Sequence, residues 1–469
     1  MGDLIVHFSL CKRVFNLVLD LIGYRSPNYR ATGFDLSVHF EIACAAATNS
    51  LTLFTGTGFS KALTDNNAPG WQQLLVNICN MHSSSSGLVA ELFPADGKNP
   101  LSLEEAAQVI QVQLASAGRD IHAEIAKQIA QVKLVGPNHA VTSFLKDNPV
   151  SVVTTNYDKL VEALVDPHDS LSFAPGLPVP RGTAKTTVYH VHGSIDSPAN
   201  MVVTADDYFK FINNESFFSR KLSTLLHERT VLILGYSLGD TNLKAILSDY
   251  KGFSRRHFTG GNILLVSREA VSQIIKDYYS QSYGIRVVDQ TNVEHFFTMV
   301  NLHMTAARET AKQVVVNTNE VLFGGKIWTD DYLKKQLSFY EIVAGVAAIG
   351  RSVSDPQVVA MLKTVIERKT VFTGHTNAWH EYEHLAHWLI LLGSILEIRG
   401  TALEAIFVDA VVQSMNTMSS NQIRGYSWHA YGHWSRGWSN VIPANRALIR
   451  ESCGERLIRA EATALINSA

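Results

Sequence analysis

The chain has 469 residues, enough for two or three domains of ordinary size. Hydrophobic residues make up 46% and charged residues 17%, and the formal net charge is −2, so the composition is globular and offers no broad basic field for nucleic acid. The four cysteines lie far apart and form no C-x-x-C pair, which argues against a zinc ribbon or a disulfide framework.

The first 48 residues are expected to form N-terminal helices, because apolar side chains recur at helical spacing in residues 4–22 and again in residues 35–48. Lys12 and Arg13 interrupt the first apolar segment and no small-residue cleavage site follows it, so no signal peptide is expected. No run approaches the roughly 18 uncharged apolar residues of a membrane-spanning helix. We therefore expect a soluble, cytoplasmic protein.

From about residue 50, short apolar runs rich in β-branched residues alternate with helical stretches, a pattern typical of a parallel sheet with helices on both faces. Six runs are predicted to be strands: Leu51–Phe54, Val150–Thr154, Thr187–Val191, Val231–Leu234, Ile263–Val266 and Ile285–Val288. Ligands of such sheets bind beyond the carboxyl ends of the strands. The residues that directly follow each run are therefore the candidates for a functional site.

A glycine-containing turn, Gly56-Thr57-Gly58-Phe59-Ser60, follows the first predicted strand. Glycines in a strand-to-helix turn let backbone amides approach a phosphate closely, and the start of a helix favours negative charge. A tight turn also needs glycine for its own sake, so this motif alone is weak evidence.

Polar segments follow three further predicted strands: Thr154-Thr155-Asn156-Tyr157-Asp158, Val191-His192-Gly193-Ser194 and Gly235-Tyr236-Ser237-Leu238-Gly239-Asp240. Each alone has an ordinary structural explanation, such as a helix cap, a strand-end histidine or a turn. Together, and in this order after successive strands, they favour a shared ligand site.

The four segments resemble the NAD-contacting stretches of the sirtuin family, in the family order, across about residues 48–290. In detail they are similar to the sirtuin-like NAD hydrolases of bacterial antiphage defence, where T-T-N-Y-D, H-G-S and G-Y-S-L-G-D versions are usual and a tryptophan often stands in the first helix, as Trp71 does here. The resemblance implies an α/β fold, a sirtuin-like (Rossmann-type) doubly wound parallel sheet, followed by an all-α C-terminal domain.

The resemblance also implies a role for each matching residue. Asn156 and His192 would be catalytic: Asn156 would place a water or the ribose at the reacting carbon, and His192 would act as the base. Asp158 would hold the nicotinamide amide. The remaining NAD contacts would be Gly56, Gly58 and Ser60 at the pyrophosphate, Gly235, Ser237 and Asp240 at a phosphate or the adenosine ribose, and also Thr57 and Thr155.

These residue types suit cleavage of the bond between nicotinamide and ribose, because the ribose gains oxocarbenium character and needs an oriented water and a base that titrates near neutral pH. A protein deacetylase of the family carries a four-cysteine zinc module and an Arg-containing segment after the glycine turn. Here no cysteine lies between Cys79 and Cys453, and Lys61–Pro69 contains no Arg. We therefore expect water as the acceptor, NAD as the substrate and no zinc.

After about residue 295 the pattern is helical. The predicted helices are Val293–Val315, Thr329–Ala348, Asp355–Lys369, Trp379–Arg399, Leu403–Met418 and Asn445–Leu465. We therefore predict three parts: N-terminal helices at 1–48, a sirtuin-like NAD-binding catalytic domain at 49–300, and a helical regulatory or assembly domain at 320–469. The boundary is expected near Asn317–Lys326.

One motif in the helical part suggests a different chemistry. The segment from His380 to His384 matches H-E-x-x-H, which on a helix can bind zinc beside a catalytic Glu, with His387 or Glu397 as the candidate third ligand. The surrounding sequence is rich in Trp and His, which is more typical of an aromatic core or interface with hydrogen-bonding histidines.

The sequence thus favours an NAD glycohydrolase that yields nicotinamide and ADP-ribose and depletes cellular NAD in antiphage defence, by abortive infection. Because unrestrained turnover would kill the host, a switch is expected: assembly into a homo-oligomer, a phage-derived trigger or a second defence protein. No membrane or nucleic-acid partner is expected. Three alternatives stay open: a sirtuin-like deacylase or ADP-ribosyltransferase, a zinc peptidase that uses His380 and His384, and a non-catalytic nucleotide sensor.

Overall fold

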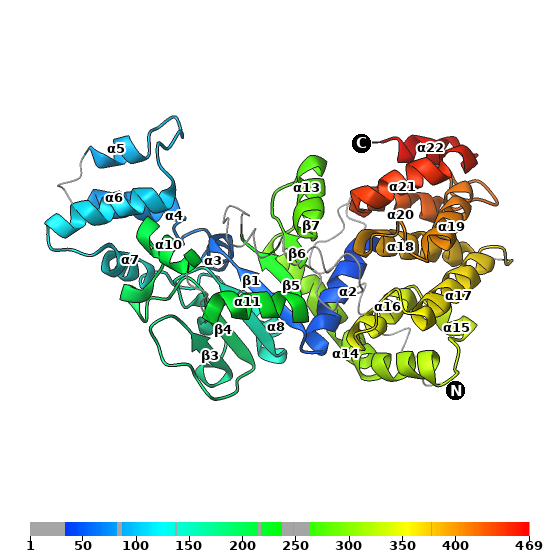
Figure 1. The fold of residues 1–469 in the computed structure, drawn as a ribbon, viewed down its shortest axis with the longest axis horizontal. Coiled ribbons are helices and arrows are strands. Elements are labelled where there is room, and N and C mark those ends of the chain that lie inside the picture. The colour runs from blue at the N-terminus through cyan, green and yellow to red at the C-terminus, as the bar shows by residue number, and fades with distance from the viewer. Residues whose placement is uncertain are drawn as a thin grey trace.

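A computed structural model describes residues 33–81, 87–136, 138–213, 217–236, 247, 263–376 and 378–468. Figure 1 shows a sheet in the middle of the molecule, a group of helices beyond one end of it, and the C-terminal helices at the opposite side. The first predicted helix lies outside the described residues. The second is helix α2, Gly33–Ala47.

In the residues that the structure describes, the sheet has seven parallel strands in the order β3-β4-β2-β1-β5-β6-β7. Their bounds are β1 Leu51–Thr55, β2 Val150–Thr154, β3 Ser170–Phe173, β4 Thr186–His190, β5 Thr230–Leu234, β6 Ile263–Val266 and β7 Ile285–Val288. The strand order changes direction at β1, which lies between β2 and β5, and ligands of doubly wound sheets bind at such a point. The predicted fold class, a doubly wound parallel sheet followed by helices, is confirmed.

The six predicted strands are present, with bounds within one residue of those predicted, but β3 was not predicted from the sequence. This strand is a four-residue edge strand that, within the described part of the chain, pairs with β4 alone, and all of its residues are partly exposed. Its serines alternate with Leu171 and Phe173, so it lacks the continuous apolar run of a strand that is buried on both faces. Strand β3 therefore lacked the signal by which the others were found.

Helices cover both faces of the sheet and generate a separate core on each. Helices α2, α8 (His139–Asp147) and α14 (Val293–Phe323) pack on one face, where Phe144 and Phe297 lie with ring centroids 4.8 Å apart. Helices α11 (Phe217–Glu228) and α13 (Gln273–Tyr283) pack on the other face. The central strands are buried on both faces of the sheet, which explains why their sequences are largely apolar.

A third core belongs to a helical cap beyond the carboxyl ends of the strands (Figure 1). The cap contains α4 (Trp71–Met81), α5 (Leu88–Leu92), α6 (Leu103–Ser116), α7 (Ile121–Ile129) and α10 (Ala205–Asn213). Helix α6 begins with a capping box in which Ser102 and Glu105 satisfy each other's backbone amides. Two short helices directly follow strands. Helix α3 (Thr57–Leu63) follows β1 and leads to α4 of the cap, and α9 (Leu160–Ala163) follows β2 and packs in the core on the sheet face.

The C-terminal part is helical, as predicted. Its helices are α15 (Asp330–Leu333), α16 (Ser338–Ala348), α17 (Pro356–Phe372), α18 (Trp379–Ile395), α19 (Glu404–Asn416), α20 (Trp428–Gly437), α21 (Pro443–Cys453) and α22 (Ala460–Ile466), with 3-10 turns at Pro167–Asp169, Pro198–Asn200, Trp438–Asn440 and Gly454–Arg456 along the chain. Two predicted helices are each split in two, and α20 was not predicted. Its two glycines and mixed aromatic and polar residues obscure a helical pattern, and Ser427 marks its start by capping Ala430.

Helix α14 joins the two halves of the molecule. It continues 8 residues past the predicted end and ends at Phe323, inside the region where a domain boundary was expected. Its first half packs on the sheet, and its second half packs against α16, where Gly345 lies over Thr318. One apolar cluster therefore extends from the sheet into the C-terminal helices, and the division into two domains stays a prediction.

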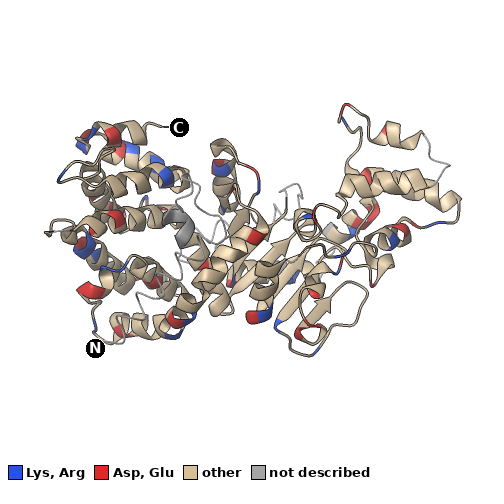
Figure 2. Cartoon of the chain, turned by 180° about the vertical axis from the view of Figure 1, so that it is seen from behind, with Lys and Arg blue, Asp and Glu red and all other residues tan. Residues whose placement is uncertain are grey.

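Positively and negatively charged residues are interspersed over the described part of the molecule, and neither sign dominates a large region (Figure 2). Within the part of the chain that the structure describes, no helix is both long enough and apolar enough to cross a membrane.

The contact between α14 and α16 can be tested at Gly345. A Cβ atom at this position would lie 2.0 Å from Oγ1 of Thr318, whose hydroxyl donates to the carbonyl of Val314. We expect Gly345→Ala to lower the free energy of unfolding by about 1–3 kcal/mol, measured by urea denaturation. Adding Thr318→Ala should recover part of that loss, because the clashing oxygen is gone; a single variant as stable as wild type would contradict this packing.

Candidate active site

A cavity of about 720 Å³ lies between the carboxyl ends of the strands and the helical cap. Six of the predicted site residues line it: Thr57, Ser60, Thr155, Asn156, Asp158 and His192. Gly56, Gly58 and Gly235 form the turns beneath it, whereas Ser237 and Asp240 lie outside the described residues. Residues from three separate strand ends thus meet at one cavity.

The side chains of Ser60, Asn156 and Asp158 form a hydrogen-bonded chain. The Ser60 hydroxyl donates to Oδ2 of Asp158 at 2.7 Å, and Nδ2 of Asn156 donates to the same hydroxyl at 2.8 Å. A hydroxyl has a single proton, and because Ser60 gives it to Asp158, it can only accept from Asn156. These hydrogen bonds therefore determine the orientation of the Asn156 side-chain amide. The side-chain carbonyl oxygen of Asn156 takes no part in them and can accept a hydrogen bond from another group.

Asp158 is held in place at both carboxylate oxygens. Oδ1 accepts from the backbone N–H of Leu160 at 3.1 Å, and Oδ2 accepts from Ser60. Burial raises the pKa of Asp158 above its ordinary value, although these hydrogen bonds oppose the rise. The carboxylate is thus a rigid acceptor at the edge of the cavity, in a setting that disfavours its charge.

His192 follows β4 and faces the cavity from a nearly buried position, with 7% of its surface exposed. Its ring packs edge-on against Tyr208 and Phe211 of α10, with centroids 5.5 and 5.3 Å away. The glycine after it is required by geometry, because Gly193 has φ +91° and a Cβ there would lie 2.7 Å from Cα of Met201. The H-G pair therefore combines a polar group with a turn that needs glycine.

The glycine turn after β1 packs directly against the turn after β5. The backbone N–H of Gly58 donates to the carbonyl of Gly235 at 2.7 Å, and a Cβ on Gly58 would lie 2.8 Å from Cα of Gly235. Gly235 itself has φ +59°, which favours glycine. The close approach of the two turns thus explains why glycine occupies these positions. The predicted contacts of these glycines with a phosphate stay predictions.

Aromatic side chains form much of the cavity wall, and no role in the site was predicted for them from the sequence. Trp71 and Tyr157 meet edge to face at 6.1 Å, and the Tyr157 hydroxyl donates to the carbonyl of Val202 at 2.6 Å. Tyr208 and Phe209 of α10 also line the cavity, and Phe209 is 62% exposed. Tyr157 belongs to the same motif as Asn156, but its position in the sequence does not indicate which residues it contacts.

A half-buried charge cluster attaches α10 to α7. His122 of α7 contacts Oδ2 of Asp207 at 2.8 Å through Nε2 and Oδ1 of Asp120 at 3.2 Å through Nδ1. The hydrogen bond to Asp207 raises the pKa of His122, partly offset by burial. Burial would raise the pKa of Asp207, but the bonds from His122 and Thr204 outweigh it and lower that pKa. The cluster fixes the helix that packs on His192.

Comparison with known proteins identifies part of the chain that forms this cavity. Residues 150–288 match the family model described as SIR2-like domain, and this range contains β2 to β7 together with Asn156, Asp158 and His192. The chain carries a SIR2-like domain. Its resemblance to sirtuin-like NAD hydrolases of antiphage defence, predicted from the motifs, is confirmed at this level.

The SIR2-like domain has relatives among characterised proteins. The chain is 25% identical over 260 residues to Defense-associated sirtuin 2 of Bacillus subtilis. The aligned segment covers 54% of this chain and 24% of the relative. It is 33% identical over 130 residues to NAD(+) hydrolase ThsA of Enterococcus faecium, an alignment that covers 26% of each chain. It is 32% identical over 113 residues to NAD(+) hydrolase ThsA of Bacillus cereus (strain MSX-D12), an alignment that covers 22% of this chain and 24% of the relative. The chain therefore spans about a quarter of the length of these relatives.

The H-E-x-x-H segment does not form a metal centre in the structure. His380 is 83% exposed at its side chain, and Glu381 is paired with the buried Lys369 at 2.6 Å. Nδ1 of His384 lies 3.3 Å from the same Lys369 ammonium, so a cation already occupies this position. Among the described residues, no group of three His, Cys, Asp or Glu side chains could hold a metal ion.

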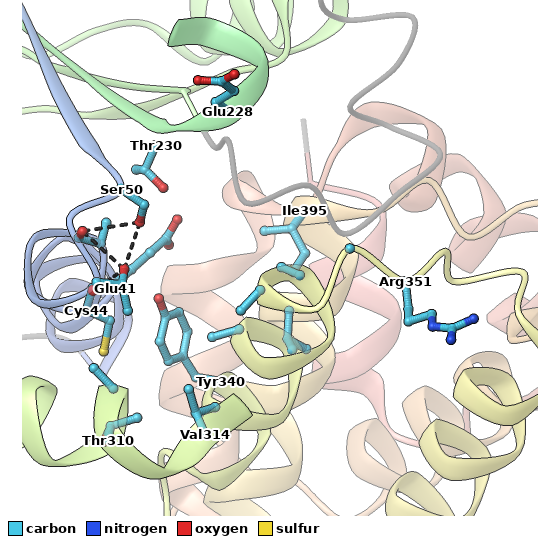
Figure 3. A pocket seen from close by; sticks show the side chains of 18 of the residues that line it. Glu41, Cys44, Ser50, Glu228, Thr230, Thr310, Val314, Tyr340, Arg351 and Ile395 are labelled. Carbon is cyan, nitrogen blue, oxygen red and sulfur yellow. Dashed lines mark hydrogen bonds between the residues drawn. The ribbon is translucent and has the colours of Figure 1, made fainter. Parts of the chain in front are cut away.

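A second cavity, of about 640 Å³, lies between α2, α14 and α16, away from the SIR2-like motifs (Figure 3). Glu41, Cys44 and Tyr340 are among its lining residues. Glu41 is paired with Arg286, and burial raises the pKa of the Cys44 thiol and of the Tyr340 hydroxyl far above their ordinary values. Its buried groups are therefore paired or neutral at neutral pH.

The approach of the two glycine turns predicts a selective effect of a single methyl group. We expect Gly58→Ala to lower the free energy of unfolding by about 1–3 kcal/mol, because its Cβ would meet the backbone of Gly235. Gly87→Ala is the matched control, since no atom lies within 4 Å of a Cβ at that position. Equal thermal unfolding of the two variants would contradict the close contact.

The His122 cluster predicts a pH-dependent contribution to stability. The raised pKa of His122 means that its contribution is complete below its unfolded pKa, near 6.5, and is lost as pH rises through the folded value. The lowered pKa of Asp207 means that its contribution is present above about pH 4 and is lost at lower pH. His122→Leu should therefore cost about 1–3 kcal/mol near pH 5.5 and much less near pH 9, measured by urea denaturation. His168→Leu, at an exposed histidine, is the control; a cost that does not vary with pH would refute the charged pair.

Proposed function

We propose that the chain is an NAD glycohydrolase that cleaves NAD to nicotinamide and ADP-ribose. The observation that carries the proposal is the oriented amide of Asn156, held by Ser60 beside Asp158, in one cavity with His192. Relatives named NAD(+) hydrolase and Defense-associated sirtuin support an NAD-cleaving enzyme in defence at the level of the family. The volume of the cavity, about 720 Å³, falls within the range of about 300–1,000 Å³ of small-molecule sites.

The proposed chemistry assigns complementary roles to Asn156 and His192. The bond between the ribose and the nicotinamide nitrogen breaks, the electron pair leaves with the nicotinamide, and the ribose gains oxocarbenium character. The Asn156 carbonyl oxygen orients a water toward that carbon. His192 takes the proton that the water loses as the new C–O bond forms, a role for which a histidine that is neutral at physiological pH is suited.

The remaining residues would bind the substrate and hold the catalytic groups. Asp158 would accept from the nicotinamide amide, and Thr57, which lines the cavity, would contact the pyrophosphate. Ser60 would act chiefly as a positioning residue, because its hydroxyl is already engaged by Asp158 and Asn156. The aromatic wall with Trp71 would exclude bulk water around the reacting ribose.

Water is proposed as the acceptor rather than an acylated peptide. The sequence has no cysteine between Cys79 and Cys453, so the zinc module of protein deacetylases has no ligands here. The helical cap with α10 closes the wall beside His192.

In the cell, we propose that NAD depletion in the cytoplasm serves antiphage defence and that the C-terminal helices hold the enzyme inactive until it is triggered. Helix α14 supports this division of labour, since it packs on the sheet at one end and on α16 at the other. Assembly into a homo-oligomer, a phage-derived trigger or a second defence protein would supply the switch, because unrestrained NAD loss would be lethal.

The direct test is nicotinamide release from NAD by purified protein over a range of protein concentrations. We expect Asn156→Ala and His192→Ala to lower kcat by a factor of about 10²–10⁴, the usual contribution of such groups, while both variants unfold like wild type. Lys312→Ala, which removes only an exposed ion pair, is the control. Normal turnover by both site variants would overturn the assignment, and tight NAD binding without release at any concentration would replace it with a nucleotide sensor.

A further inference from the structure

His190, the last residue of β4, is completely buried directly beneath the candidate active site. Its Nδ1 lies 3.2 Å from the backbone carbonyl oxygen of Asn156, and its Nε2 lies 2.9 Å from Oε1 of Glu162 on α9. One ring thus connects the backbone of the predicted catalytic residue to a buried carboxylate.

Both partners of His190 are acceptors. A backbone carbonyl has no proton to give, and an ionised carboxylate has none either, so each ring nitrogen must carry a hydrogen to make a bond. A neutral imidazole has only one N–H and would leave one of these pairs as two facing acceptors. The geometry therefore requires the doubly protonated, cationic ring.

The surroundings keep Glu162 ionised. Its Oε1 also lies 2.8 Å from Nζ of Lys159 and accepts from the Ser172 hydroxyl, and Lys159 in turn pairs with Asp196 at 2.9 Å. Burial alone would raise the pKa of Glu162, but His190 and Lys159 outweigh it and hold the pKa at about 2. Asp158, near the same ring, is the other carboxylate that faces it.

The contact with His190 completes the fixation of Asn156. Its backbone N–H donates to Oγ1 of Thr154 at 3.1 Å, its carbonyl meets His190, and its side-chain amide donates to Ser60. Removing one of these three constraints would let the amide move, and displacement of a reacting group by about 1 Å can cost a factor of about a hundred in rate.

We propose that His190 is a buried imidazolium, paired with Glu162, that positions Asn156 for cleavage of NAD. The positioning role rests on the proposed NAD glycohydrolase function, whereas the charged state of the ring does not. Glu162 has two tasks: it keeps the proton on His190, and it neutralises a cation that would otherwise repel the positive charge developing on the ribose.

The pair predicts a specific pH dependence of kcat. His192 must be neutral to act as base, which gives the acid limb of the profile. Without a proton on one ring nitrogen, one of the two hydrogen bonds of His190 would become a contact between two acceptors, so we expect kcat to fall on the alkaline side of the profile. Glu162→Gln removes the carboxylate that stabilises the charged ring, so the alkaline limb should move to lower pH while the acid limb stays in place.

The kinetic test compares Glu162→Gln and His190→Gln with Tyr189→Phe. Tyr189 is the neighbouring residue of β4 and stacks on Phe173, facing the other core, so it serves as a matched control. At pH 7.5 we expect kcat to fall about tenfold to a hundredfold in both site variants with little change in KM, and to stay near wild type in Tyr189→Phe. An alkaline limb that does not move in Glu162→Gln, or a loss of kcat fully explained by unfolding, would overturn the positioning role.

A second measurement is independent of NAD turnover. In protein labelled with ¹⁵N-histidine, the ring signals of His190 can be assigned by their absence in His190→Gln, or by their altered titration in Glu162→Gln should the first variant fail to fold. We expect both ring nitrogens to carry protons at pH 7.5, and a neutral ring would overturn the proposal. If wild type released no nicotinamide while this ring was cationic, the proposed function would fail and the buried imidazolium would stand.

Discussion

The candidate site depends on how closely the turn after β1 approaches the turn after β5. Gly58 donates its backbone N–H to Gly235 at 2.7 Å, and neither residue has room for a Cβ atom. This contact sets where α3 begins, and α3 carries Ser60. The Ser60 hydroxyl in turn orients Asn156 and holds Asp158, which come from the end of β2. A backbone approach that only glycine permits thus determines the geometry of three polar side chains.

The polar groups around the site are organised as two charge clusters of buried and half-buried groups. In one, Glu162 and His190 hold the backbone of Asn156. In the other, His122 and Asp207 hold α10, whose aromatic residues pack on His192. Buried charges are costly unless they are paired and hydrogen-bonded, so clusters of this kind restrict how the groups around them can move. Rigid placement of an amide and a base is what water-mediated cleavage of a glycosidic bond requires.

The strength of a sequence motif does not by itself predict whether its residues form a site in the folded chain. The H-E-x-x-H segment matches a zinc site by its spacing, yet Lys369 reaches both Glu381 and His384 and places a cation where the metal would bind. The strand-end motifs are individually less specific, yet they meet at one cavity because all strands of the sheet are parallel and end at the same edge. Three-dimensional convergence, rather than the strength of any one motif, separates the two cases.

The sequence by itself determined the α/β fold class, six of the seven strands, the helical C-terminal part and the set of polar residues at the strand ends. These features depend on periodicity and on residues adjacent in the chain. Only the tertiary structure decided that β3 is an edge strand, that the Ser60 hydroxyl bonds Asn156 across 96 positions, and that His190 meets Glu162 across 28. Such contacts arise when distant segments pack together, and a hydroxyl or an imidazole carries no local signal of which distant group will become its partner.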